Sequence, residues 1–173
     1  MPRTATLLLS SALLTTLGVS TLHAQASIAA ETKRTYMGVK DHILAAAAKM
    51  PDDGFAFKPT PDIRSFAEVV NHITEAQNHT CPAVIGGQTE MPKTEEGMMK
   101  KEAVLTALKN SFSLCDRAYD SMTDANAGST IKTPRGERTR LGALVGNIAH
   151  DQEQWGIMSV YLRLKNIHPT GSE

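Results

Sequence analysis

The sequence is short of several features that would point to a particular class of protein. Its 18 basic and 18 acidic residues balance, so it lacks the excess of positive charge that a nucleic-acid-binding surface needs. No segment after residue 26 is apolar enough to span a bilayer, which takes about 20 consecutive apolar residues. The chain also contains no glycine-rich phosphate loop and no serine or cysteine in a recognisable nucleophile setting. We therefore expect neither nucleic acid nor membrane as a partner of the mature protein.

Cysteine is scarce as well, because the chain contains only Cys81 and Cys115. Both fall within predicted helices, and in an oxidising compartment they could pair if their Cα atoms lie within about 7 Å of each other. The alternative is that both are small buried side chains. In either case their role would be structural.

The first 26 residues have the features of a secretory signal peptide. Arg3 gives a positive start, residues 5–19 are predominantly apolar, and the Ala-Gln-Ala triplet at 24–26 fits a small-x-small cleavage site. Residue 27, directly after the cleavage site, is serine and not cysteine, which argues against a lipoprotein anchor. Cleavage would leave a single domain of 147 residues, 27–173, with a net charge of about −1 because Arg3 is the only charged residue lost. We therefore expect an exported protein of the periplasm.

Apolar periodicity and helix stop signals predict four helices and no strand. Pro51 stops the first helix, and Ser65 begins the second by forming a capping box with Glu68. Pro82 would kink the second helix or end it early. The loop 123–138 is rich in helix breakers. The predicted helices span about 29–50, 65 to the glycine pair 86–87, 100–122 and 140–165. Four helices of this length predict an all-α four-helix bundle.

Two of the predicted helices carry a polar stripe beside the apolar one. The members are Glu68, His72, Glu75 and His79 on the second helix and Asn147, His150, Gln154, Ile157 and Tyr161 on the fourth. If the two stripes face each other inside a bundle, His72 and His150 converge on a pocket and could hold a divalent transition metal. Spacing alone favours the alternative that these side chains face solvent, as polar residues beside an apolar stripe usually do.

Glu75 and Glu153 are candidates for orienting the imidazoles or for acting as a base. The alternative is that such residues form solvated pairs along a helix, as Glu68 with His72 and Glu75 with His79 would. A di-iron bundle would need two Glu-x-x-His motifs, and the sequence has none.

Resemblance to a known family favours metal binding over the solvent-facing alternative. The segments MPDDGFAFKPTPDIRSFAEVVNHITEAQNHTC and HDQEQWGIMSVYLRLKNIHP resemble the DinB-like (YfiT-like) superfamily of four-helix metalloproteins, over residues 36–169. In that family a histidine of the second helix and a His-x-x-x-His pair of the fourth bind zinc, nickel or iron. The resemblance therefore implies His72 and His150 as ligands. The second member of the pair falls on Gln154, whose neutral amide oxygen is a weaker ligand than imidazole.

The glutamine leaves two functions open. In the first, His72, His150 and Gln154 hold a divalent ion in a metal-dependent hydrolase or transferase whose small-molecule substrate is unknown. His79, two turns or about 10 Å from His72, is an alternative ligand. In the second, the bundle has lost its metal and is a non-enzymatic periplasmic protein that binds a small molecule or serves in stress. Pairing through helix faces is common in the family, so a homodimer is a further expectation.

Overall fold

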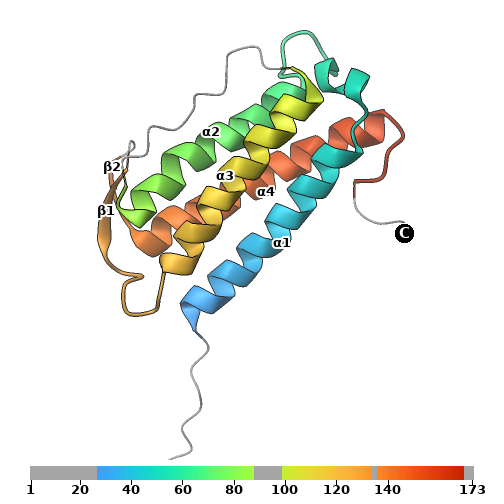
Figure 1. The fold of residues 1–173 in the computed structure, drawn as a ribbon. Helices are drawn as coiled ribbons and strands as arrows, with labels where there is room; N and C mark the ends of the chain where they lie inside the picture. The colour runs from blue at the N-terminus through green and yellow to red at the C-terminus, as the bar shows by residue number, and fades with distance from the viewer. Residues whose placement is uncertain (1–26, 88–98, 134–135, 170–173) are drawn as a thin grey trace, which may run out of the picture.

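Four long helices lie side by side in a bundle (Figure 1). The computed structural model describes residues 27–87, 99–133 and 136–169, so the predicted signal peptide lies outside the described residues. The helices are α1 (Ile28–Lys49), α2 (Phe66–Ile85), α3 (Lys101–Ser121) and α4 (Arg140–Leu164), with a 3-10 helix, η1 (Asp52–Ala56), after α1. Each of the four long helices begins and ends within about two residues of its predicted bounds. The predicted four-helix bundle is confirmed as a mostly helical fold.

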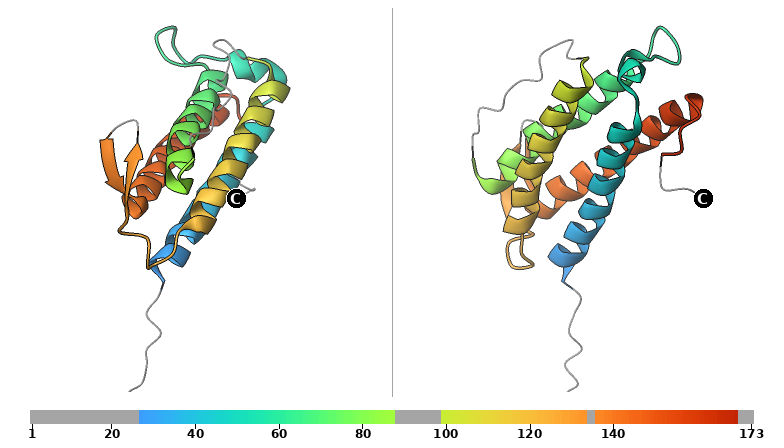
Figure 2. Two further views of the ribbon diagram at one scale, coloured as in Figure 1. Left: turned by 60° about the vertical axis from the view of Figure 1, so that its left-hand side comes forward. Right: turned by 45° about the vertical axis from the view of Figure 1, so that its right-hand side comes forward.

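A β-hairpin between α3 and α4 shows that the prediction of a chain without strands was wrong. Strands β1 (Thr130–Thr133) and β2 (Gly136–Thr139) pair antiparallel, with Thr130 opposite Thr139. The hairpin packs against the C-terminal end of α2 and the N-terminal end of α4 (Figure 2). These strands could not be predicted from apolar periodicity, because four-residue strands with little burial carry no apolar alternation.

The predicted ends of α2 are confirmed in detail. Ser65 Oγ accepts a hydrogen bond from the backbone N–H of Glu68 at 3.2 Å, and the Glu68 carboxylate accepts from the N–H of Ser65 at 2.5 Å. This is the predicted capping box. The helix continues through Pro82 to Ile85 and ends at Gly86, whose φ of 77° is readily available only to glycine.

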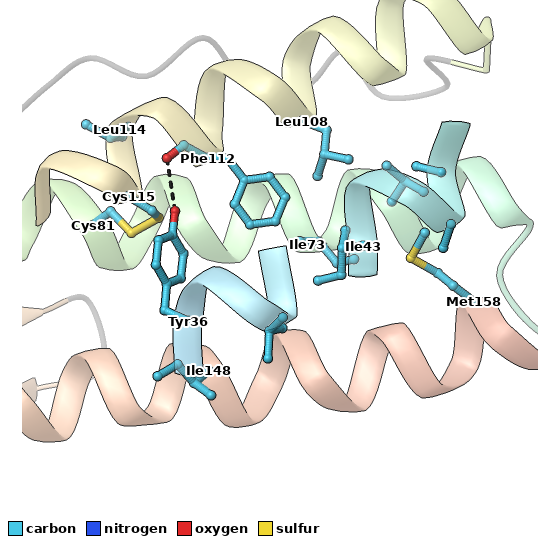
Figure 3. Close-up of a cluster of buried hydrophobic side chains, with 14 of the residues drawn as sticks. Tyr36, Ile43, Ile73, Cys81, Leu108, Phe112, Leu114, Cys115, Ile148 and Met158 are labelled. Carbon is cyan, nitrogen blue, oxygen red and sulfur yellow. Dashed lines mark hydrogen bonds between the residues drawn. A yellow bond between two sulfur atoms is a disulfide. The ribbon is translucent and has the colours of Figure 1, made fainter. Parts of the chain in front are cut away.

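Apolar side chains from all four helices fill the centre of the bundle (Figure 3). The largest fully buried ones include Tyr36 and Ile43 of α1, Ile73 of α2, Leu108 and Phe112 of α3, and Leu144 and Met158 of α4. Helix α2 packs against both α3 and α4, so its polar residues can meet partners on either side. Within the described ranges, no helix combines the length and apolar composition needed to cross a bilayer.

A disulfide between Cys81 and Cys115 joins α2 to α3 (Figure 3). The two Cα atoms are 5.0 Å apart, and both residues are fully buried. Of the two alternatives left open by the sequence, pairing is therefore the one found.

Candidate functional site

His72 and His150 meet across the packed faces of α2 and α4. These helices run antiparallel: Arg140 donates to the carbonyl oxygen of Val84 at one end, and Tyr161 donates to that of Arg64 at the other. Between these contacts, the Nε2 atoms of the two histidines are 3.1 Å apart, with ring centroids at 4.9 Å. Both side chains are half-buried. The predicted convergence of the two imidazoles is present in the fold.

A buried carboxylate orients the ring of His150. Asp151 Oδ1 lies 3.2 Å from His150 Nδ1, and the Asp151 side chain is 1% exposed. An ionised carboxylate can only accept, so this contact favours the tautomer that carries its hydrogen on Nδ1. The lone pair of Nε2 then points toward His72. A histidine held in this way by a carboxylate is the usual arrangement of a metal-binding imidazole.

Asp151 is itself held by a network of buried polar side chains. Its Oδ2 accepts from Gln77 Nε2 at 2.8 Å and from Asn147 Nδ2 at 3.2 Å. Ser111 Oγ lies 2.6 Å from Gln77 Oε1, and the Tyr119 hydroxyl lies 3.1 Å from Asn147 Oδ1. Residues of α2 and α4 thus contact one carboxylate, and two residues of α3 support those contacts from behind. Because every partner is buried, the network fixes the position of that carboxylate and, through it, the imidazole of His150.

The electrostatics of this carboxylate reflect two opposing effects. Burial raises the pKa of Asp151, while hydrogen bonds from His150 and Gln77 lower it, and burial is the larger effect. Burial also raises the pKa of the Tyr119 hydroxyl above its ordinary value, with a smaller contribution from the nearby Asp151 charge. Tyr119 therefore acts only as a neutral hydrogen-bond donor to the network.

Gln154 lies one turn beyond His150 on α4 and is 5% exposed. Among the described residues, its side-chain oxygen Oε1 has no hydrogen-bond partner. A buried carbonyl left in this state costs about 1–3 kcal/mol and is uncommon in native structures. A cation at this position would satisfy it. Gln154 Oε1 is thus a buried oxygen, one turn along α4 from His150, that lacks a hydrogen-bond partner in the described part of the chain.

The spacing of the two imidazole nitrogens also fits a shared ion. With metal–nitrogen bonds of about 2.0–2.1 Å, two ligands of a tetrahedral ion lie about 3.3–3.4 Å apart, and two adjacent ligands of an octahedral ion about 2.9 Å apart. The observed 3.1 Å lies between these values. Across the described ranges, however, no three residues of the types His, Cys, Asp and Glu cluster as metal ligands. Any third protein ligand here must be of another type, such as the amide of Gln154.

A cavity of about 310 Å³ adjoins His150 on the side of the hairpin. Its walls come from α2 (Ala76, His79, Thr80), the hairpin (Thr133, Arg138) and α4 (Ala143, Gly146, Asn147, His150). The structure thus places His79, the alternative ligand, in the wall of a cavity that His150 shares.

Asp151 is a site residue that was not predicted from the sequence. Glu75 and Glu153 were predicted to orient the imidazoles, but both side chains are exposed, and Asp151 orients His150. One signal was present: Asp151 lies in helical phase with Leu144, Ile148 and Trp155 of the apolar stripe. A charged residue in such a stripe is buried and must have partners.

Comparison with known proteins identifies the family. The family model described as the DinB superfamily matches residues 38–158, well over half of the chain. The chain belongs to the DinB superfamily. The resemblance noted in the sequence is thereby confirmed.

Solved DinB-like structures share the fold at low sequence identity. A DinB-like protein from Bacillus cereus superposes with a TM-score of 0.67 at 14% identity, covering 85% of this chain and 98% of its own. A DinB-like protein from Bacillus subtilis gives 0.65 at 17% identity, covering 79% and 92%, and a conserved protein from Enterococcus faecalis gives 0.62 at 16%, covering 81% and 98%. No curated protein matches the chain significantly. At these identities the likeness establishes the DinB fold alone, and the metal ligands His72, His150 and Gln154 stay a prediction.

Proposed function

We propose that this DinB protein binds one divalent transition metal ion, zinc, nickel or iron, between α2 and α4. The ligands are the Nε2 atoms of His72 and His150 and the Oε1 atom of Gln154. The observation that carries the proposal is the 3.1 Å approach of the two Nε2 atoms. Three protein ligands leave a coordination position for water or substrate, as in catalytic metal sites. A bound ion would supply Lewis-acid chemistry of the kind used by metal-dependent hydrolases and transferases.

Asp151 has a defined part in this proposal. It holds the hydrogen on His150 Nδ1, so that Nε2 presents its lone pair to the ion. Gln77 and Asn147 fix Asp151 in turn, and both are themselves buried. The site is therefore preorganised on the His150 side by rigid helices instead of loops.

The second candidate is a bundle without metal that binds a small molecule and is not an enzyme. One observation favours it: 3.1 Å is also the length of a hydrogen bond from His72 Nε2–H to the lone pair of His150 Nε2. In that state the two imidazoles satisfy each other. The amide of Gln154 is then a substitution that removed the strongest third ligand.

Elemental analysis separates the two functions. Protein purified without a metal-binding tag should contain zinc, nickel or iron near one ion per chain, and His150→Ala should contain none. His168→Ala is the matched control, because His168 is an exposed histidine beyond the end of α4. A wild-type protein without metal, whose melting temperature is unchanged by these ions, would establish the second candidate.

Gln154→His is the sharper test of the ligand set. Structural zinc sites reach about 10–16 kcal/mol in total, so a third imidazole in place of the amide should add several kcal/mol to the binding free energy. A gain of about 3–4 kcal/mol is a few hundredfold in affinity for zinc, measured by competition with a chromogenic chelator. Unchanged affinity would mean that position 154 does not face the ion shared by His72 and His150.

We further infer that the protein is exported after removal of residues 1–26. The support is the buried Cys81–Cys115 disulfide, because disulfides persist mainly in oxidising compartments such as the periplasm. Cell fractionation and the intact mass of the secreted chain test this inference. A full-length chain in the cytoplasm would contradict it. The homodimer is an expectation that light scattering on the purified protein tests.

A further inference from the structure

The cavity beside His150 has a chemistry of its own. Apart from His150, none of its lining residues belongs to the proposed ligand set. Its volume of about 310 Å³ lies at the lower end of the range of about 300–1,000 Å³ for small-molecule pockets. It therefore suits a compact organic molecule.

The basic side chains in the wall are an arginine and two histidines. Arg138 is permanently positive, His79 adds a second imidazole to that of His150, and Thr80 adds a hydroxyl. No aspartate or glutamate is among the described residues that line the cavity. Such a wall favours a ligand with negative charge and disfavours a cation.

Arg138 is held in place without a carboxylate partner. Its Nη2 donates to the carbonyl oxygen of Gly142 at 2.8 Å, and no acidic side chain in the described part of the chain pairs with it. The guanidinium lies against Gly146, where an added Cβ would be only 3.0 Å from Nη1. The absence of a side chain at position 146 thus gives the guanidinium its place at the cavity wall. Its remaining N–H groups are available for an anion.

We propose that this cavity binds a small organic carboxylate, with the carboxylate against Arg138 and the organic body directed toward His150. A planar carboxylate matches the planar guanidinium. A doubly charged phosphate would need more than the one permanent cation that the wall provides. The proposal goes beyond the metal site and does not depend on it. If the metal binds, the organic body of the ligand lies beside it.

Benzoate and benzamide test the proposal, because they have nearly the same shape and differ in charge. Calorimetric titration into chelator-treated, metal-free protein should show saturable binding of benzoate and at least tenfold weaker binding of benzamide. Equal binding of the two compounds, or no binding of benzoate at millimolar concentration, would overturn the proposal.

Three variants locate the site. Arg138→Gln should weaken benzoate binding about tenfold or more, whereas Arg117→Gln, an exposed arginine of α3 outside the cavity wall, should leave it unchanged. Gly146→Ala should also weaken binding, because its Cβ displaces the guanidinium. The melting temperature of this variant should not fall, since alanine suits a helix interior better than glycine. Wild-type affinity in Arg138→Gln would refute the assignment.

Failure of the carboxylate proposal can be distinguished from failure of the metal proposal. Metal content is measured on the same preparations before chelation. Benzoate binding in a protein purified without metal supports the carboxylate site alone. Metal in a protein that does not bind benzoate overturns the carboxylate site and leaves the ligand set of His72, His150 and Gln154 standing.

Discussion

Loss of the Cys81–Cys115 disulfide should lower the stability of the bundle by a calculable amount. The perturbation is the double substitution Cys81→Ala and Cys115→Ala. The two cysteines lie on neighbouring helices, α2 and α3, and both are fully buried. Their sulfur atoms lie 3.9 and 4.0 Å from Asn147 Oδ1, so they also pack against the polar network behind His150.

The sequence separation sets the magnitude. The cysteines are 34 positions apart, and closing a loop of this length reduces the entropy of the unfolded chain by an amount worth about 4 kcal/mol at 25 °C. For the 147 residues that the predicted cleavage would leave, the entropy of unfolding is about 0.3 kcal/mol/K. The melting temperature should therefore fall by about 13 °C.

Urea unfolding of the wild type and of the double alanine variant measures this difference. A phosphine reductant should destabilise the wild type toward the variant and should not change the variant itself, which serves as the control. A difference below about 1 kcal/mol would refute the entropic argument. Two titratable thiols in the protein denatured without reductant would refute the disulfide itself.

Three further predictions concern single side chains. Hydrogen bonding to Ser65 holds the pKa of Glu68 below its ordinary 4.5, so its contribution to stability is complete above that pH and is lost as the pH falls through the lowered value. Glu68→Gln should cost less than about 1 kcal/mol at pH 7, because the carboxylate is partly exposed, and this cost should shrink as the pH falls through the lowered pKa; a pH-independent difference in urea unfolding would contradict this. Tyr119→Phe should lower the free energy of unfolding by about 1–2 kcal/mol, since it removes the hydroxyl that lies 2.9 Å from the carbonyl oxygen of Leu144; wild-type stability would show that this contact contributes nothing. Asp151→Asn should weaken zinc binding by about 10–100-fold in chelator competition, and an unchanged affinity would mean that Asp151 does not position His150.

The helices were readable from the sequence because their signals are local. Ser65 and Glu68 form a capping box within one turn, Pro51 follows the end of α1, and Gly86 takes the left-handed conformation that ends α2. Each signal acts through residues a few positions apart, so it survives without knowledge of the fold. The β-hairpin has no comparable local signal. Its short strands are stabilised by pairing with each other and by contacts with α2 and α4, which are distant or only partly local in the sequence.

Only part of the candidate site could be predicted from the sequence. The sequence placed His72 in the polar stripe of α2, and His150 and Gln154 in that of α4. Their spacing alone, however, predicted that the stripe of α4 faces solvent. The structure buries Asn147 and Gln154 of that stripe at 4% and 5% exposure, because α4 packs there against α2. Which side of a helix is covered depends on its neighbours, and periodicity alone does not name them.

The sequence by itself determined four helices, their ends, and the two imidazoles, one on each of two helices. Only the tertiary structure decided that these imidazoles meet across 78 residues of chain, that Asp151 fixes one of them, and that Arg138 reaches the adjoining cavity. The physical reason is the separation along the chain over which each kind of interaction acts. Helix formation and capping are settled by neighbours within a turn or two, whereas a site assembled from α2, α4 and a hairpin exists only once their faces are packed together.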